Sequence, residues 1–300
     1  MNRRTFFASS LTAAAGATLG VRPVRDAEAA DAGQAIPLKI GIRAASMKLA
    51  GNIDVIRAAA RITGLMGVEL QATAGSPNLR DWETVRRYKR EADRWAMRIP
   101  SLAGVWDRGV EIRSPAAAES IRLSIRAAEI LGSNTLLLAF FKAQAPDMSR
   151  EDSYGPLVAM LREVAPRAAD AGVTLGLENS LSPADNMKLV DLVAHSAVRV
   201  YYDVHNMAFY GHGEQAVSGI RLLGRERLCA VHVKNDSHLI EEPGPIDWPA
   251  AFRAFTEIGY EGWYVYETSH ATIENCIEDT KRNNVFLRHN LRMPVAESPK

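Results

Sequence analysis

The 300-residue sequence contains only two cysteines and almost no excess charge of either sign. Cys229 and Cys276 are too few for a disulfide framework and too far apart in the sequence for a compact metal knuckle, so we interpret them as buried apolar thiols. A formal net charge of +1 gives no sign of the basic surface that a nucleic-acid-binding protein requires, and we expect no nucleic-acid partner. Hydrophobic residues make up 47% of the chain, which is enough to bury a substantial core.

The first 29 residues differ in composition from the rest. Arg3 and Arg4 stand as a pair before two phenylalanines, and a run rich in Ala, Gly, Ser and Thr follows over residues 8–21. This run is too short and too rich in Gly and Thr to span a bilayer well. Together with the small-x-small cleavage pattern Ala27-Glu28-Ala29, it resembles a twin-arginine export signal. An amphipathic N-terminal helix and an uncleaved membrane anchor are the alternatives.

We therefore expect residues 1–29 to engage the twin-arginine translocation machinery, which would leave a periplasmic or otherwise exported protein. Residues 30–36 would be a short linker, residues 37–293 the folded domain, and residues 294–300 a C-terminal tail. No low-complexity linker interrupts the chain after residue 36, which predicts one domain.

From residue 37 onward the sequence repeats one pattern: a short apolar run, a polar or glycine-containing turn, and a segment with helical periodicity. Two Ser-Pro pairs, Ser114-Pro115 and Ser182-Pro183, are helix-start signals, and a last helix is predicted over residues 273–291. The eight apolar runs are predicted strands, and they are Leu38–Ile42, Val68–Leu70, Ile99–Ala103, Thr135–Ala139, Val173–Leu177, Val198–Tyr202, Cys229–Val233 and Trp263–Tyr266.

Strands that alternate with helices predict a parallel sheet, because a parallel return requires a crossover. Eight such units in about 260 residues match the size of a (β/α)₈ TIM barrel. A doubly wound open sheet is the alternative fold. It would need fewer strands, and no glycine-rich dinucleotide loop follows the first predicted strand. We therefore predict an α/β fold of the TIM-barrel type.

Four polar side chains stand at the ends of the fifth to eighth predicted strands, where barrel enzymes place their chemistry. These residues are Glu178, Asp203, His232 and Glu267, spaced 25, 29 and 35 residues apart, or one strand–helix unit each. Three carboxylates beside one imidazole repel one another unless a cation lies between them. The donor set therefore predicts one divalent ion, with Mn²⁺, Mg²⁺, Co²⁺ and Zn²⁺ all compatible. The alternative is four unrelated strand-end residues in water or in local salt bridges.

The sequence around these four residues resembles the xylose isomerase-like TIM-barrel superfamily, the group of sugar phosphate isomerases and epimerases. The resemblance covers residues 38–290. It extends to ketose 3-epimerases, hydroxypyruvate isomerase, inosose isomerases and dehydratases, and endonuclease-four DNA-repair enzymes. The strings that carry it are Leu177-Glu178-Asn179, Tyr202-Asp203-Val204-His205-Asn206, Val231-His232-Val233-Lys234-Asn235 and Val265-Tyr266-Glu267-Thr268.

The resemblance implies a metal-dependent isomerase or epimerase that acts on a keto-sugar or cyclitol through an enediolate. Glu178 and Glu267 would be both metal ligands and proton-transfer groups on opposite faces of the substrate. Export from the cytoplasm and the lack of a phosphate-binding loop favour a substrate without phosphate. Relatives of this kind often form homo-oligomers, although no separate sequence signal indicates one here.

Five further residues are candidate substrate contacts. Lys234 lies two residues beyond His232 and therefore on the same side of its strand, with a solvent-exposed rim lysine as the alternative. The resemblance places Asn206 against substrate. His205 faces either the site or only its loop, Glu69 contacts substrate or forms a salt bridge, and Trp106 stacks on a sugar or packs in the core.

Two other activities and a loss of activity are the competing hypotheses. A lyase or dehydratase of the inosose type would use the same metal and carboxylates on a keto-sugar or keto-glycoside. A non-catalytic sugar-binding barrel would be expected to have lost a ligand, and all four remain. DNA repair is disfavoured, because Gln71, Ala72 and Trp106 follow the second and third strands where that branch needs histidines, and Asn206 replaces another.

Overall fold

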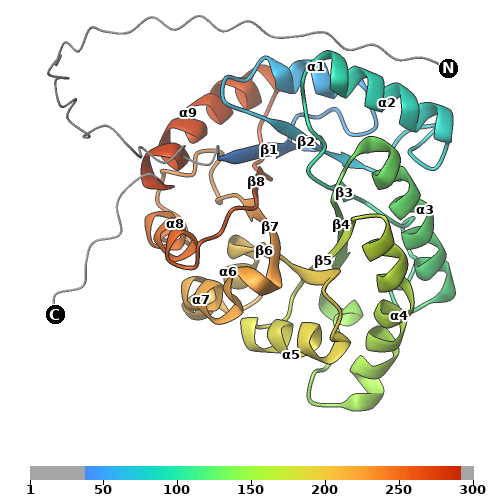
Figure 1. Ribbon diagram of the computed structural model, residues 1–300. Coiled ribbons are helices and arrows are strands. Elements are labelled where there is room, and N and C mark those ends of the chain that lie inside the picture. The colour runs from blue at the N-terminus through green and yellow to red at the C-terminus, as the bar shows by residue number, and fades with distance from the viewer. Residues whose placement is uncertain (1–37, 292–300) are drawn as a thin grey trace, which may run out of the picture. The chain divides into compact units, whose positions relative to one another are not determined.

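The computed structural model describes residues 38–291, which form a closed barrel of eight parallel strands surrounded by helices (Figure 1). Each strand pairs with the next, and β1 pairs with β8 to close the barrel. The predicted single-domain (β/α)₈ TIM barrel is confirmed. The predicted segments 1–29, 30–36 and 294–300 lie outside the described residues. The strands are β1 Lys39–Arg43, β2 Gly67–Gln71, β3 Leu102–Ala103, β4 Thr135–Phe140, β5 Thr174–Asn179, β6 Val198–Asp203, β7 Leu228–Val233 and β8 Trp263–Tyr266.

Five of the helices, α2, α3, α5, α6 and α8, begin at a residue whose side chain caps them. Ser114 Oγ accepts a hydrogen bond from the Ala117 amide at the start of α3, and Ser182 Oγ accepts one from the Asp185 amide at the start of α5. The helices are α1 Asp54–Ala60, α2 Trp82–Arg94, α3 Pro115–Leu131, α4 Glu151–Asp170, α5 Pro183–Val193, α6 Val204–Phe209, α7 Ala216–Arg227, α8 Trp248–Glu257 and α9 Ile273–Leu291, with short 3₁₀ turns at Lys142–Gln144 and Gly213–Gln215.

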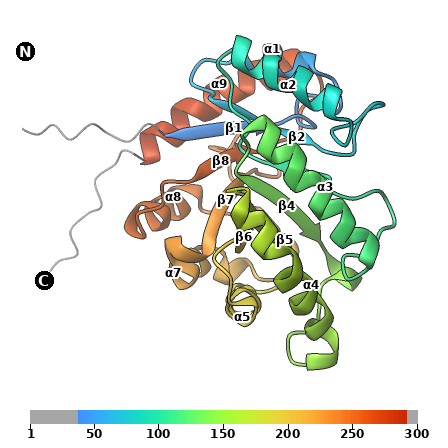
Figure 2. The same ribbon diagram turned by 45° about the vertical axis from the view of Figure 1, so that its right-hand side comes forward.

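The helices pack against the outer face of the barrel. The view in Figure 2 shows α3 and α4 side by side across β4 and β5. Large apolar side chains such as Phe252 and Phe255 of α8 are fully buried in this outer layer, where each contributes about 2–3 kcal/mol of hydrophobic stabilisation. No helix within residues 38–291 has both the length and the apolar character needed to cross a membrane.

Alternation along the strands sends a second set of side chains into the barrel. A separate apolar cluster fills its interior, made up of Ala103, Leu137, Tyr201, Ala230, Trp263 and Val265. Because side chains alternate with a period of two, the residue two positions beyond each of these also points inward. The residue two positions beyond Tyr201 is Asp203, the one beyond Ala230 is His232, and the one beyond Val265 is Glu267. The interior packing therefore directs polar side chains at the strand ends toward the barrel axis.

The third strand is shorter than predicted. The apolar run Ile99–Ala103 predicted five strand residues, whereas only Leu102–Ala103 form the strand. Pro100 has no amide hydrogen to donate, so the regular ladder with β2 is interrupted there. The neighbouring backbone still provides two bonds, from the Val68 amide to Arg98 O (3.0 Å) and from the Leu70 amide to Ser101 O (3.2 Å).

Candidate metal centre

The structure brings together the four side chains that the sequence predicts as metal ligands. Each of Glu178, Asp203, His232 and Glu267 offers one donor atom, and these atoms all lie within 4.8 Å of one another. The first three side chains are buried, whereas Glu267 is 17% exposed at the mouth of the barrel. Donor atoms this close to one another can contact a single small ion placed between them.

His232 lies at the base of the cluster and is fully buried. Its Nδ1 atom is 3.2 Å from Glu178 Oε1 and 3.4 Å from Glu267 Oε2, so this nitrogen faces the other ligands. Its Nε2 atom lies on the opposite edge of the ring, 3.4 Å from Glu69 Oε1. Burial alone would lower the pKa of His232, but the charges of Glu178 and Glu69 outweigh it and raise the pKa to about 9.

Glu69 of β2 lies below His232 and has no exposed surface. Its Oε2 atom accepts hydrogen bonds from Ser101 Oγ (2.6 Å) and Tyr201 Oη (2.9 Å). Burial tends to raise the pKa of Glu69, but His232 above all, together with Arg43 and Ser101, lowers it to about 2. Glu69 thus lies against Arg43 and His232, and the alternative of a substrate contact stays a prediction.

Two cations lie among the carboxylates. Lys234 Nζ is 2.6 Å from Asp203 Oδ2 and 2.7 Å from Glu267 Oε2, so this mostly buried lysine lies among the predicted ligands. Arg43, the last residue of β1, forms an ion pair with Glu267 and lies 3.5 Å from Glu69 Oε1. Arg43 was not predicted as a site residue, because the first strand was predicted to end at residue 42. Its position two residues beyond the inward-facing Gly41 was the available signal.

The short helix α6 links two of the predicted ligands through Asn206. Asp203 is the N-cap of α6, and its Oδ1 atom accepts a hydrogen bond from the Asn206 amide (2.9 Å). The Asn206 side chain in turn donates from Nδ2 to Glu178 Oε1 (3.1 Å). His205, the residue before it, points toward the loop after β7, where its Nε2 atom lies 2.7 Å from Asp236 Oδ1. Asn206 is thus in the cluster and His205 at its edge.

Aromatic side chains lie around the mouth of the barrel. Trp106, a predicted substrate contact, is partly buried and packs against the hydrophobic core. Phe141, which follows β4, stacks on Tyr210 at the end of α6 with ring centroids 5.5 Å apart. Burial above all, together with the charges of Glu178 and Asp203, raises the pKa of Tyr210. Tyr210 is therefore a rim residue that the sequence analysis did not single out.

The segment after β8 is held by a buried hydrogen-bonded chain. Thr268 Oγ1 lies 2.7 Å from His270 Nε2, and His270 Nδ1 lies 3.0 Å from Asp279 Oδ2 of α9. Thr268 directly follows Glu267, so this chain restrains the backbone that carries the most exposed of the four predicted ligands.

The charges of the site fit one divalent ion. Four carboxylates, Glu69, Glu178, Asp203 and Glu267, face two cations, Arg43 and Lys234. With a neutral His232 as ligand, two negative charges remain, which is the charge that one divalent cation neutralises. Three carboxylate oxygens and one imidazole nitrogen are donors that Mn²⁺, Mg²⁺, Co²⁺ and Zn²⁺ accept. The residues therefore fit the predicted ion, and the donor set does not select among the four metals.

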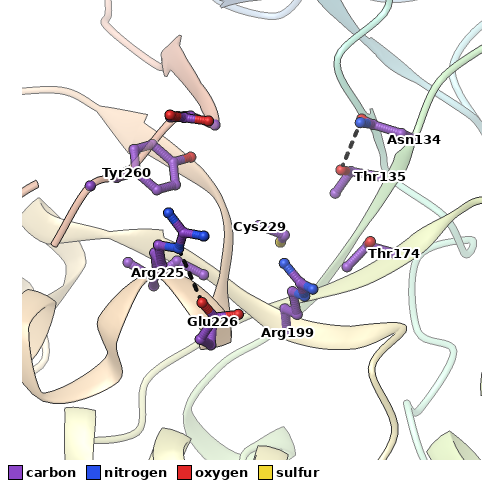
Figure 3. A pocket seen from close by; sticks show the side chains of 12 residues that line it. Asn134, Thr135, Thr174, Arg199, Arg225, Glu226, Cys229 and Tyr260 are labelled. Carbon is purple, nitrogen blue, oxygen red and sulfur yellow. Dashed lines mark hydrogen bonds and ion pairs between the residues drawn. The ribbon is translucent and has the colours of Figure 1, made fainter.

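A cavity of about 270 Å³ opens at the other end of the barrel. In Figure 3, the side chains of Arg199, Thr174 and Cys229 point into it, from the amino-terminal halves of their strands. Burial raises the pKa of the Cys229 thiol to about 12, so this cysteine stays protonated and is a poor nucleophile. The cavity contains none of the four clustered ligands, and barrel enzymes act at the opposite, carboxyl end.

The chain belongs to the xylose isomerase-like TIM-barrel family, whose model matches residues 56–288. Among solved structures it is similar to a D-psicose 3-epimerase in the presence of D-fructose, with 15% identity, a TM-score of 0.70, and coverage of 85% of this chain and 99% of that one. A D-psicose 3-epimerase from Clostridium cellulolyticum H10 with D-tagatose has 18% identity, a TM-score of 0.69, and coverage of 85% and 100%.

A third similar structure is the apo form of 3-keto-D-glucoside 4-epimerase from E. coli, with 15% identity, a TM-score of 0.68, and coverage of 84% of this chain and 99% of that one. No curated protein sequence matches the chain. At these identities the structural similarities show the shared fold and do not show the reaction.

Proposed function

We propose that this protein is a divalent-metal-dependent isomerase or epimerase that acts through an enediolate on a non-phosphorylated keto-sugar or cyclitol. The observation that supports it most directly is the convergence of Glu178, Asp203, His232 and Glu267 within 4.8 Å at the carboxyl end of the barrel. The similar structures named as sugar epimerases are consistent with that chemistry.

The two proposed proton-transfer groups, Glu178 and Glu267, reach the cluster from β5 and β8, on either side of His232 Nδ1. When bound, a divalent ion would polarise a substrate carbonyl and stabilise the negative charge that develops as the neighbouring C–H bond breaks. Asn206 holds Glu178 by a neutral amide, and Lys234 and Arg43 hold Glu267 by charge. In the proposed reaction each of these carboxylates would take or return a proton on its own face of the substrate.

The surroundings of the site support a substrate without phosphate. Phosphate-binding barrels use the loops after strands 7 and 8 and the start of a nearby helix. Here Asp247 caps α8 and accepts a hydrogen bond from the Ala250 amide (2.9 Å), and Glu274 lies in the first turn of α9. Carboxylates at both helix starts repel a phosphate dianion and occupy an amide that would bind it.

The test is exchange of a substrate proton with solvent. Wild-type protein loaded in turn with Mn²⁺, Co²⁺, Mg²⁺ or Zn²⁺ is incubated with a panel of ketoses, keto-glycosides and inososes in D₂O, and the products are analysed by NMR and mass spectrometry. We expect deuterium next to the carbonyl and formation of an epimer or isomer, with both lost in Glu178→Gln and Glu267→Gln.

Other outcomes of the same test identify the competing activities. Release of water or of a glycosyl group would identify a lyase, which begins with the same proton abstraction. Binding of a sugar without any exchange, in protein shown to carry about one metal ion per chain, would contradict the enzymatic proposal in favour of a sugar-binding barrel.

We also propose that the protein is exported, on the basis of the paired arginines and the cleavage pattern in residues 1–29. The measurement is N-terminal sequencing of the protein from a periplasmic fraction, with wild type compared with a variant in which Arg3 and Arg4 are both replaced by lysine. Export that is unchanged in the double variant would contradict the twin-arginine route.

A further inference from the structure

Glu69 is fully buried and lies against a predicted metal ligand, His232. Its two oxygens face different partners. The Oε2 atom accepts hydrogen bonds from Ser101 Oγ and Tyr201 Oη, which fix the plane of the carboxylate. The Oε1 atom is left facing His232 Nε2 at 3.4 Å and Arg43 Nε at 3.5 Å. Within residues 38–291, neither Glu69 Oε1 nor His232 Nε2 has a hydrogen-bond partner, and both atoms are buried.

The imidazole of His232 is restrained on one face as well as at one edge. The Tyr201 ring lies 4.5 Å from it between centroids, and the same tyrosine donates to Glu69. The ring is therefore packed by Tyr201 while its Nε2 edge is directed at Glu69. The opposite Nδ1 edge faces Glu178 and Glu267. In the metal-free protein both ring nitrogens face carboxylates, and Nδ1 lies within hydrogen-bond distance of Glu178 Oε1 (3.2 Å). A neutral imidazole carries one N–H, so a cation bound at the Nδ1 edge leaves that hydrogen on Nε2, where Glu69 can only accept it.

We propose that Glu69 is a positioning residue that holds the hydrogen of neutral His232 on Nε2 and so leaves the Nδ1 lone pair free for the metal ion. This inference rests on the proposed function, because it assumes that the cluster binds a metal. Arg43 Nε lies 3.5 Å from the same Oε1 atom, so this oxygen faces two nitrogen donors, one on Arg43 and one on His232. A histidine ligand whose second nitrogen donates to a carboxylate is a more basic and better oriented ligand.

The diagnostic variant is Glu69→Gln, which keeps the size of the side chain. Its amide can donate to His232 Nε2, which would favour the tautomer with hydrogen on Nδ1 and block the metal-binding edge. We expect metal affinity, measured by competition with a chelator, to fall about 10- to 100-fold. Glu69→Asp, which retains a carboxylate, should recover part of the loss.

The matched control is Glu257→Gln, which removes a carboxylate from an ion pair with Arg221 on the outer surface of α8. It should leave metal affinity unchanged. Metal affinity of Glu69→Gln equal to wild type would overturn the inference and make Glu69 a structural partner of Arg43 alone. Wild-type protein that binds none of the four ions would overturn the proposed function and this inference with it, so the two failures differ.

A second measurement needs no substitution at Glu69 and therefore does not depend on the stability of that variant. In Zn²⁺-loaded wild-type protein, ¹⁵N–¹H NMR of the histidine side chains reports which nitrogen of His232 carries hydrogen, with assignment by the signals missing from His232→Ala. We expect hydrogen on Nε2 and metal on Nδ1. Hydrogen on Nδ1 would overturn the proposal.

Discussion

Raising the pH from 6 to 8 should strengthen binding of a divalent ion about 100-fold. In the metal-free protein the pKa of His232 is about 9, so at both pH values the imidazole carries a proton that a metal ligand must lose. Each pH unit below the pKa therefore changes the apparent affinity about tenfold, or about 1.4 kcal/mol. Glu69, with a pKa of about 2, stays ionised throughout and adds no slope. Above pH 9 the affinity should level off.

The assay is titration with Mn²⁺ in chelator buffers at several pH values, combined with calorimetry in buffers of different ionisation enthalpy. Calorimetry should detect the release of about one proton per ion bound at pH 7. His289→Gln, a change to an exposed histidine of α9, should leave the slope unchanged. Equal affinities at pH 6 and pH 8, after correction for the chelator, would refute the argument that His232 must lose a proton to bind the ion.

Three further measurements address stability and activity. The pKa of His232 is raised from 6.5 to about 9, so its protonation stabilises the metal-free fold fully below pH 6.5. The free energy of unfolding should therefore fall by up to about 3.4 kcal/mol as the pH rises from 6.5 through 9. Urea titrations that show a rise over this range would contradict the reasoning. Asn206→Ala removes the Nδ2 donor to Glu178 and should lower kcat/KM about tenfold in a protein that still folds. An unchanged kcat/KM would show that this hydrogen bond does not contribute to activity. Gly219→Ala places a Cβ atom 2.5 Å from Pro183 Cγ and 2.7 Å from Tyr202 Oη. Thermal unfolding should therefore show a stability lower by about 1–3 kcal/mol. An unchanged Tm would mean that the contact between α5 and α7 relaxes without cost.

The barrel and the four converging ligands were predictable from the sequence because both depend on local periodicity. Alternating strand and helix patterns specify a parallel sheet, and a parallel barrel brings the carboxyl ends of all strands to one rim. Glu178, Asp203 and Glu267 could therefore be placed together without coordinates. The same period of two would have placed Arg43 in the site, had the first strand been extended by one residue.

The length of β3 and the existence of α6 were less predictable. The apolar run at residues 99–103 favours a strand, but Pro100 has no amide hydrogen for a bond to the neighbouring strand. Whether that missing bond interrupts the strand depends on which strand lies beside it, and the sequence does not show this. Helix α6 is only six residues long and depends on Asp203 as its cap. A helix this short has no periodicity to detect, because it forms only where tertiary contacts hold it.

The sequence by itself determined which residue types reach the carboxyl end of the barrel, because strand order and alternation follow from local pattern. Only the tertiary structure decided which of these polar side chains contact one another inside the barrel. Glu69 and His232 come from strands on different parts of the barrel, and their pairing depends on the stagger that closure imposes across strands. That stagger places Glu69 against His232, and it brings Arg43 and Lys234 against Glu267. Contacts between residues so far apart in the chain leave no local pattern, since they arise only when the barrel closes.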